Sequence, residues 1–216
     1  MSILDPVNSF LGKLDSGRPI VSVDIDNTIA FFTQHLLAVI NAQFDTDYKV
    51  KDQDRPGLHF LSGDELQYAL IQHSSPIFFR TMAPDYSAIA SVQAIKDAGY
   101  YVIIASSRVP EVQEATIKWL DKWQVPYDEV RVGHHVKEQV LSEYPNVMFI
   151  DDNPHVVNHL SGPQVQIRLL RRSYTGTITD VGDIQVVDYW DQILSELNIS
   201  TPSKIPALTV STLGWT

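Results

Sequence analysis

Residues 19–30 read Pro-Ile-Val-Ser-Val-Asp-Ile-Asp-Asn-Thr-Ile-Ala, a run of β-branched apolar residues that ends in two carboxylates. The Ile and Val residues predict a buried strand over residues 20–25. Side chains two positions apart on an extended chain point the same way, so we expect Asp24 and Asp26 to face one site. Because two neighbouring anions repel each other, the pair predicts a bound cation or a shared proton. The alternative is a solvated turn whose Asp-Asn-Thr sequence only caps a helix.

The composition describes an acidic chain with enough apolar residues for one sizeable core and an inserted subdomain. It has 216 residues, of which 44% are hydrophobic. The formal net charge of -10 argues against nucleic acid or an anionic membrane surface as the main partner. There is no cysteine, which excludes disulfides and thiolate metal sites and favours a cytoplasmic location. No secretory signal pattern or membrane-spanning apolar run is visible, so we expect no membrane partner.

Strand and helix patterns alternate along most of the chain. Strands are expected over residues 20–25, 100–105, 130–132, 147–150, 165–170 and 184–187. Helices are expected over residues 29–44, 63–73, 85–99, 110–123, 136–144, 154–160 and 190–197. Alternation at this spacing predicts an α/β fold with a Rossmann-like, doubly wound parallel sheet that carries helices on both faces.

The same patterns divide the chain into a core and an insert. Residues 1–30 and 84–198 are expected to form the α/β core, with a short helical lead-in before residue 19. Residues 31–83 are expected to form a small helical cap inserted after the first strand. Residues 199–216 are rich in Ser, Thr and Pro, so we expect a C-terminal tail that is extended or disordered.

Polar residues follow several strands of the predicted sheet, at the edge where ligands of such sheets bind. They are Asp24, Asp26, Ser106, Ser107, Arg108, Lys137, Asp151 and Asp152. Carboxylates, hydroxyls and an ammonium group gathered at one edge predict a hard-cation site beside an anion site, which Mg²⁺ with phosphate fits best. Each signal taken alone has another explanation: plain caps for the serines and the Asp pair, and solvated surface side chains for Arg108 and Lys137.

Four motifs resemble those of the haloacid dehalogenase-like (HAD) phosphohydrolase superfamily, over about residues 19–170. They are Asp24-Ile25-Asp26-Asn27-Thr28, Ile103-Ile104-Ala105-Ser106, Lys137, and Phe149-Ile150-Asp151-Asp152. Within the superfamily, the chain most resembles the 5'(3')-deoxyribonucleotidases of the cytosolic pyrimidine type. That likeness rests on Phe32, on the turn at 54–57 and on Phe78-Phe79. Asn27 stands where many relatives have Gly, and Ser106-Ser107-Arg108 replaces the usual Thr-Ser-Pro.

The resemblance implies a Mg²⁺-dependent phosphomonoesterase that works through an aspartyl-phosphate. Asp24 would be the nucleophile, Asp26 the general acid and base, and Lys137 a catalytic cation. Thr28, Ser106, Ser107 and Lys137 would bind the phosphate. The Mg²⁺ ligands would be Asp24, Asp26 through its backbone carbonyl, and one residue of the Asp151-Asp152 pair, with Asp152 favoured as the direct ligand.

The expected substrate is a small phosphate ester, and the resemblance favours a deoxyribo- or ribonucleoside monophosphate. Phe32, Phe60, Phe78 and Arg108 are the candidate substrate residues, although aromatic residues in a small cap also serve as its own core. Another phosphate ester, such as a sugar phosphate, a phosphorylated cofactor or a nucleic-acid 3' end, is the alternative substrate. A non-catalytic relative that binds a nucleotide or a protein is the alternative of another class. The sequence leaves the oligomeric state open, a homodimer included.

Overall fold

The computed structural model describes residues 17–53, 57–160, 165–176 and 183–202. Within these ranges the chain forms one six-stranded sheet whose paired strands all run parallel, in the order β3-β2-β1-β4-β5-β6. The strands are β1 (Ile20–Val23), β2 (Tyr101–Ser106), β3 (Glu129–Val132), β4 (Met148–Asp151), β5 (Gln166–Leu170) and β6 (Ile184–Val187). The predicted α/β class with a parallel, Rossmann-like sheet is therefore confirmed.

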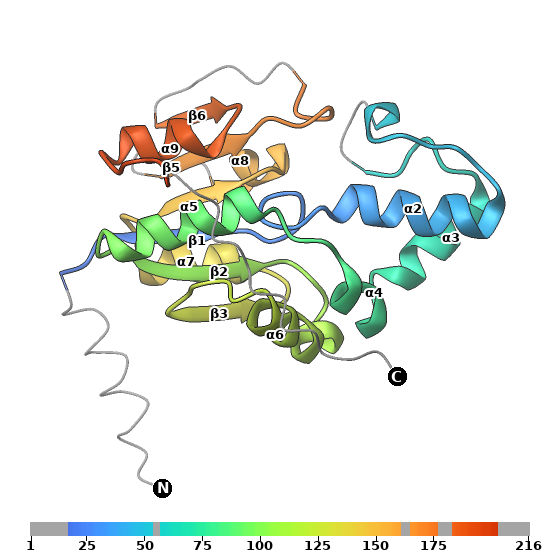
Figure 1. The fold of residues 1–216 in the computed structure, drawn as a ribbon, viewed down its shortest axis with the longest axis horizontal. Coiled ribbons are helices and arrows are strands. Elements are labelled where there is room, and N and C mark those ends of the chain that lie inside the picture. Colours follow the sequence, from blue (N-terminus) through green and yellow to red (C-terminus); the bar gives the residue numbers. More distant parts are fainter. Residues whose placement is uncertain (1–16, 54–56, 161–164, 177–182, 203–216) are drawn as a thin grey trace, which may run out of the picture.

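Helices follow the strands in the expected alternation (Figure 1). The α-helices are α2 (Phe32–Phe44), α3 (Gly63–Gln72), α4 (Pro76–Thr81), α5 (Tyr86–Asp97), α6 (Gln113–Lys122), α7 (Val136–Glu143), α8 (Pro154–Leu160) and α9 (Trp190–Glu196). Two 3₁₀ turns, η1 (Val50–Asp52) and η2 (Pro110–Val112), lie between them. Among the described residues, no helix has the length and apolar composition that are needed to cross a membrane.

Two apolar layers cover the two faces of the sheet, because successive side chains of a strand point to opposite faces. Val102 and Ile104 of β2 belong to one layer, which also contains buried residues of α5, α6 and α9. Ile103 and Ala105 of β2 belong to the other layer, together with residues of α7 and α8. Helices therefore pack on both faces, and the carboxyl ends of the strands are left open for a site.

The chain after β1 differs from the sequence prediction, because the strand ends at Val23 and the next helix begins only at Phe32. In between, the backbone N–H groups of Thr28, Ile29 and Ala30 all donate to the carbonyl of Ile25. Asn27 lies in this tight loop with a φ of 56°, a left-handed conformation that Asn tolerates better than most residues. The loop thus contains Ile25, which the apolar pattern assigned to the strand, and Ile29 and Ala30, which it assigned to the helix.

Three helices of the segment between β1 and β2 lie beyond the end of the sheet that β1 runs toward. Figure 1 shows α2, α3 and α4 together on that side, with α4 next to α6. The role of residues 31–83 as a separate small cap stays a prediction. The expected helical lead-in and most of the expected tail lie outside the described residues, in 1–16 and 203–216.

Candidate active site

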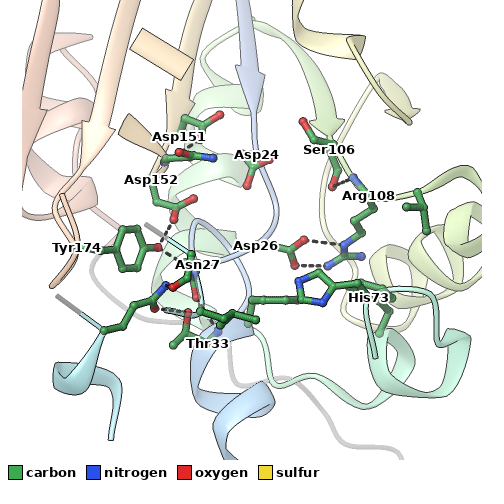
Figure 2. A pocket seen from close by; sticks show the side chains of 18 of the residues that line it. Asp24, Asp26, Asn27, Thr33, His73, Ser106, Arg108, Asp151, Asp152 and Tyr174 are labelled. Atoms are coloured by element: carbon green, nitrogen blue, oxygen red, sulfur yellow. Dashed lines mark hydrogen bonds and ion pairs between the residues drawn. The ribbon is translucent and has the colours of Figure 1, made fainter. Parts of the chain in front are cut away.

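A cavity of about 340 Å³ opens where the carboxyl ends of β1, β2 and β4 meet (Figure 2). Most of the residues that the sequence singles out line it: Asp24, Asp26, Phe32, Ser106, Ser107, Arg108, Lys137, Asp151 and Asp152. They come from the three central strands, from α2 and from α7. The sheet therefore brings together side chains that are more than 120 positions apart in the sequence, as the 124 positions between Thr28 and Asp152 illustrate.

Three candidate residues are not among the described residues that line the cavity. Thr28 is buried beneath it, and its hydroxyl donates to Asp152 Oδ1 at 3.2 Å. Phe60 packs edge-on against Tyr48, with 5.4 Å between ring centroids. Phe78 is buried behind Phe32, with 5.6 Å between ring centroids. Phosphate binding by Thr28 and substrate contact by the two phenylalanines stay predictions without support from this geometry.

Lys137 lies at the centre of the carboxylate cluster. Its Nζ donates to Asp24 Oδ1 at 2.8 Å and to Asp151 Oδ2 at 2.5 Å, and all three side chains are buried. Burial lowers the pKa of Lys137, but the two carboxylates outweigh it and hold the pKa above its ordinary value. Burial also raises the pKa of Asp24 well above its ordinary value, with Lys137 acting in the opposite direction. A solvated, surface position for Lys137 is thus excluded.

Asp152 completes the cluster from the end of β4. Its Oδ1 accepts the hydroxyl of Thr28, and its Oδ2 accepts the hydroxyl of Tyr174. Burial, reinforced by the charge of Asp151, raises the pKa of Asp152 to about 7. Among the described residues no cationic side chain forms an ion pair with this carboxyl group, and the hydrogen bonds that hold it come from neutral hydroxyl groups.

The donor set fits a hard divalent cation. One oxygen each from Asp24, Asp151 and Asp152 lies within 4.8 Å of the others. When ionised, these three carboxylates face one ammonium group, that of Lys137, so two negative charges are left uncompensated. Carboxylate oxygens in this number and with this charge suit Mg²⁺. The carboxylate of Asp26 does not belong to the group, and its backbone carbonyl as a ligand stays a prediction.

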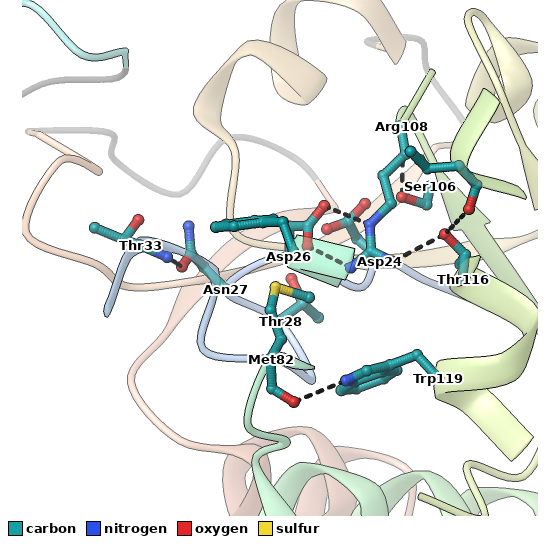
Figure 3. A network of polar contacts seen from close by, with 12 residues as sticks. Asp24, Asp26, Asn27, Thr28, Thr33, Met82, Ser106, Arg108, Thr116 and Trp119 are labelled. Carbon is teal, nitrogen blue, oxygen red and sulfur yellow. Dashed lines mark hydrogen bonds and ion pairs between the residues drawn. The ribbon is translucent and has the colours of Figure 1, made fainter. Parts of the chain in front are cut away.

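Asp26 is instead held by Arg108, which follows β2 (Figure 3). Arg108 Nε donates to Asp26 Oδ2 at 2.9 Å and Nη2 donates to Asp26 Oδ1 at 2.6 Å. Arg108 Nη1 donates to Thr116 Oγ1 at 3.0 Å, and the guanidinium lies 4.2 Å from the ring centroid of Phe79. The Arg108 side chain is only 2% exposed, which excludes the alternative of a solvated surface arginine. A carboxylate, a hydroxyl and an aromatic ring replace its water shell. Contact of Arg108 with the substrate stays a prediction.

The two serines after β2 differ in exposure. Ser106 is buried at the end of the strand, and its Oγ accepts the backbone N–H of Arg108 at 3.5 Å. Ser107 is exposed and lines the cavity. Both serines line the cavity, and their binding to phosphate stays a prediction.

Sequence reasoning missed several polar residues that line the cavity, among them Thr33, Gln53, His73 and Tyr174. Thr33 and Gln53 hydrogen-bond to each other, with 3.2 Å between Oγ1 and Oε1. The ring of His73 packs edge-on against Phe32, with 5.2 Å between centroids. None of these residues belongs to a motif at a strand end. The one sequence feature that points to them is Asn27, which stands where many relatives have Gly. In the structure, its side chain hydrogen-bonds to the hydroxyl of Tyr174 and to the backbone N–H of Thr33.

Residues 18–197 match the family model described as 5' nucleotidase, deoxy (pyrimidine), cytosolic type C protein. The chain belongs to this nucleotidase family. The recognised likeness to HAD-like hydrolases and to this nucleotidase type is confirmed, and the chain is a phosphoric monoester hydrolase. Nucleotidases of this kind act on small phosphate esters, and HAD hydrolases in general use Mg²⁺. No curated protein matches the sequence.

Solved structures share the fold of the nucleotidase chain at low sequence identity. A predicted phosphoglycolate phosphatase from Haemophilus somnus 129PT is 16% identical with a TM-score of 0.56, over 85% of this chain and 99% of its own. CbbY from Rhodobacter sphaeroides, solved with phosphate, is 14% identical with a TM-score of 0.55, over 84% and 99%. The L-2-haloacid dehalogenase from Xanthobacter autotrophicus is 12% identical with a TM-score of 0.57, over 84% and 98%. At these identities the likeness concerns the fold.

Proposed function

We propose that this nucleotidase removes the phosphate from deoxyribo- or ribonucleoside monophosphates by way of a phosphate ester on Asp24, with Mg²⁺ as the cofactor. The observation that carries the proposal is the buried group of Asp24, Lys137, Asp151 and Asp152 at the floor of a cavity with an aromatic wall. Membership of the nucleotidase family supports it.

Asp24 and Asp152 are the residues best suited to hold the cation. Both oxygens of Asp151 already accept hydrogen bonds, Oδ2 from Lys137 and Oδ1 from the backbone N–H of Asn153 at 3.0 Å, whereas Lys137 engages only Oδ1 of Asp24. Asp152 accepts only from two neutral hydroxyls, those of Thr28 and Tyr174, among its hydrogen bonds within the described residues. Its charge therefore remains for a metal ion. The bound cation supplies positive charge that offsets the repulsion between the substrate phosphate and the carboxylates.

Asp24 begins the reaction as the nucleophile. One of its carboxylate oxygens forms a bond to phosphorus, the bond from phosphorus to the ester oxygen breaks, and the leaving oxygen takes a proton from Asp26. In the second half, ionised Asp26 takes a proton from water, and the resulting hydroxide attacks phosphorus. The bond from phosphorus to Asp24 then breaks, which releases inorganic phosphate and restores both side chains. Lys137 keeps Asp24 in place through their hydrogen bond.

Arg108 fixes the resting orientation of Asp26, because its guanidinium donates to both Asp26 oxygens. In the first half, Asp26 gives the leaving oxygen the proton that it took from water in the second half of the preceding turnover. To do so, it must exchange one of its hydrogen bonds to Arg108 for a hydrogen bond to the leaving oxygen. Asp26 is 24% exposed on the cavity side, so this exchange requires a side-chain rotation and not a rearrangement of the core.

The opposite wall of the cavity supports a nucleoside as the leaving group. Phe32 and Phe79 are stacked at 25° with 6.3 Å between centroids, and both line the cavity, as Leu58 does. The side chains of Gln53 and His73 add polar groups to this otherwise apolar wall. A flat base with polar edges suits such a surface better than a sugar phosphate, whose many hydroxyls would be left without partners.

Phosphate release from a substrate panel tests the proposal. The panel contains deoxyribo- and ribonucleoside 5'- and 3'-monophosphates, sugar phosphates and p-nitrophenyl phosphate, each with Mg²⁺ and with EDTA. We expect a preference for a nucleoside monophosphate that EDTA abolishes and Mg²⁺ restores. Asp24→Asn should abolish release, whereas Asp121→Asn, on the far end of α6, should not. An active Asp24→Asn protein would contradict the mechanism, and equal rates on all esters would contradict the substrate.

A further inference from the structure

A chain of hydrogen bonds runs along one wall of the cavity, from the carboxylate cluster to the loop at residue 57 (Figure 2). The Tyr174 hydroxyl donates to Asp152 Oδ2 and accepts from Asn27 Nδ2 at 2.8 Å. Asn27 Oδ1 accepts the backbone N–H of Thr33 at 2.8 Å. The chain continues from Thr33 Oγ1 to Gln53 Oε1 at 3.2 Å, and from Gln53 Nε2 to the carbonyl of Gly57 at 3.1 Å.

The members of this chain come from separate parts of the sequence. Tyr174 lies after β5, 147 positions from Asn27 in the loop after β1. Arg172, two residues before Tyr174, donates from Nε to the backbone carbonyl of Asn27 at 2.8 Å and anchors one loop on the other. Tyr174 is 6% exposed, which leaves its hydroxyl little access to water. The contact is thus built by tertiary structure.

The backbone N–H of Thr33 determines which group donates in each hydrogen bond of the chain from Thr33 to Asp152. Only the oxygen of the Asn27 amide can accept this N–H, so the amide oxygen must face Thr33 and the NH₂ group must face Tyr174. The Tyr174 oxygen therefore acts as an acceptor toward Asn27. Its single proton is left for Asp152 Oδ2, which makes Tyr174 a donor to a carboxylate of the cluster.

We propose that Tyr174 is a positioning residue that holds the carboxylate of Asp152 for the divalent cation, and that Asn27 directs the hydroxyl of Tyr174. The inference rests on the proposed function, because it takes Asp152 as a metal ligand. Side chains that hydrogen-bond to a metal ligand hold it in the orientation that the ion requires, and their loss weakens metal binding. Asn27 occupies the position where many HAD relatives have Gly. Its hydrogen bond to Tyr174 is one that a Gly at this position could not make.

Direct cation binding to Tyr174→Phe tests the inference. Mg²⁺ binding to the full chain is measured by titration calorimetry, and Mn²⁺ binding by its paramagnetic resonance signal. Loss of the hydroxyl should weaken Mg²⁺ binding by about tenfold or more, within the range seen when such supporting groups are removed. Tyr101→Phe is the matched control, because its hydroxyl also donates to a carboxylate, that of Glu129, at the opposite end of β2. That variant should bind Mg²⁺ as the unaltered protein does.

A purely structural role for Tyr174 predicts a different pattern. It would lower the fraction of folded protein, and so the maximal rate of phosphate release, without moving the Mg²⁺ concentration for half-maximal binding. A positioning role instead predicts that Tyr174→Phe raises the Mg²⁺ concentration for half-maximal binding. The rate of phosphate release at saturating Mg²⁺ should then change much less than this concentration does. Unchanged Mg²⁺ affinity in Tyr174→Phe would overturn the inference.

Asn27→Gly provides a second, independent variant that keeps the backbone, because Gly adopts a φ of 56° readily. It should weaken Mg²⁺ binding in the same direction, and adding it to Tyr174→Phe should cost less than the sum of the two single effects. Strictly additive effects would show that Asn27 does not act through Tyr174. Binding is read without a substrate, so failure of the substrate panel would overturn the proposed function and leave this comparison intact.

Discussion

Lys137→Met removes the ammonium group that lies between Asp24 and Asp151 and keeps an apolar side chain of similar length. Removing one partner of a buried ion pair typically costs about 3–5 kcal/mol, because the remaining charge stays buried and unpaired. Lys137 is buried and bonds to two carboxylates at 2.8 and 2.5 Å, so this range applies without a discount for solvent screening. For a chain of this size, each kcal/mol shifts the melting midpoint by about 2–4 °C. We therefore expect the midpoint in EDTA to fall by about 6–20 °C.

Thermal unfolding in EDTA and in Mg²⁺ measures this effect. Mg²⁺ should raise the midpoint more in Lys137→Met than in the unaltered protein, because the cation then meets three carboxylates with no ammonium beside them. Lys118→Met is the matched control: this lysine is also ion-paired on a helix, at 2.5 Å from Glu114, but it is exposed. An exposed pair of this kind contributes little to stability, because water and salt screen its charges. If Lys137→Met lowered the midpoint no further than Lys118→Met, the charge argument for the cluster would be refuted.

Three further predictions concern proton balance, Asp26 and the aromatic wall. Because burial raises the pKa of Asp152 to about 7 from 3.8, the folded protein binds more protons than the unfolded chain between these values, and stability in EDTA is lost as the pH rises through them. Mg²⁺ displaces these protons, so the rise in melting midpoint on adding Mg²⁺ should grow from about pH 5 to about pH 7.5, and a constant rise would contradict this. Arg108→Lys keeps the charge but not the two parallel bonds to Asp26, so kcat should fall by up to about 10²-fold, and an unchanged kcat would show that Arg108 does not position Asp26. Phe32→Ala should raise KM for a nucleoside monophosphate by about fivefold or more, and should not change KM for glycerol phosphate in this way. Phe60→Ala is the control, because Phe60 packs against Tyr48 and is not among the described residues that line the cavity. Equal effects of the two substitutions on KM would argue against base stacking by Phe32.

The sequence was informative wherever a residue's role depends on its place along one element. Apolar runs marked the buried strands, and the rule that ligands bind at the carboxyl ends of parallel strands placed Asp24, Ser106 and Asp151 at one edge. The start of the helix expected over residues 85–99 was also readable: α5 begins at Tyr86, and Asp85 Oδ1 accepts the N–H groups of Ser87 and Ala88. These features arise from local periodicity and from the regular geometry of a parallel sheet.

Contacts between distant loops could not be read in this way. Tyr174 follows β5 in a stretch with no periodic pattern, and its partners lie 22 and 147 positions away. Arg108 gave no sign of burial, because its partners Asp26 and Phe79 reach it only when the chain after β1 and α4 folds over β2. Side-chain placement of this kind depends on how segments meet in space, which neither composition nor spacing records.

The central position of β1 has a consequence for motion in the site. β1 lies between β2 and β4, and the hydrogen-bond ladder continues past its end, where the backbone N–H of Asp24 donates to the carbonyl of Ile150. Amide hydrogens in such a position exchange with solvent only when the sheet as a whole opens, an event far rarer than a catalytic turnover. The proposed nucleophile, Asp24, therefore follows directly on a strand whose amide hydrogens we expect to exchange slowly. The fluctuations that admit substrate and release phosphate must arise in the segments around it.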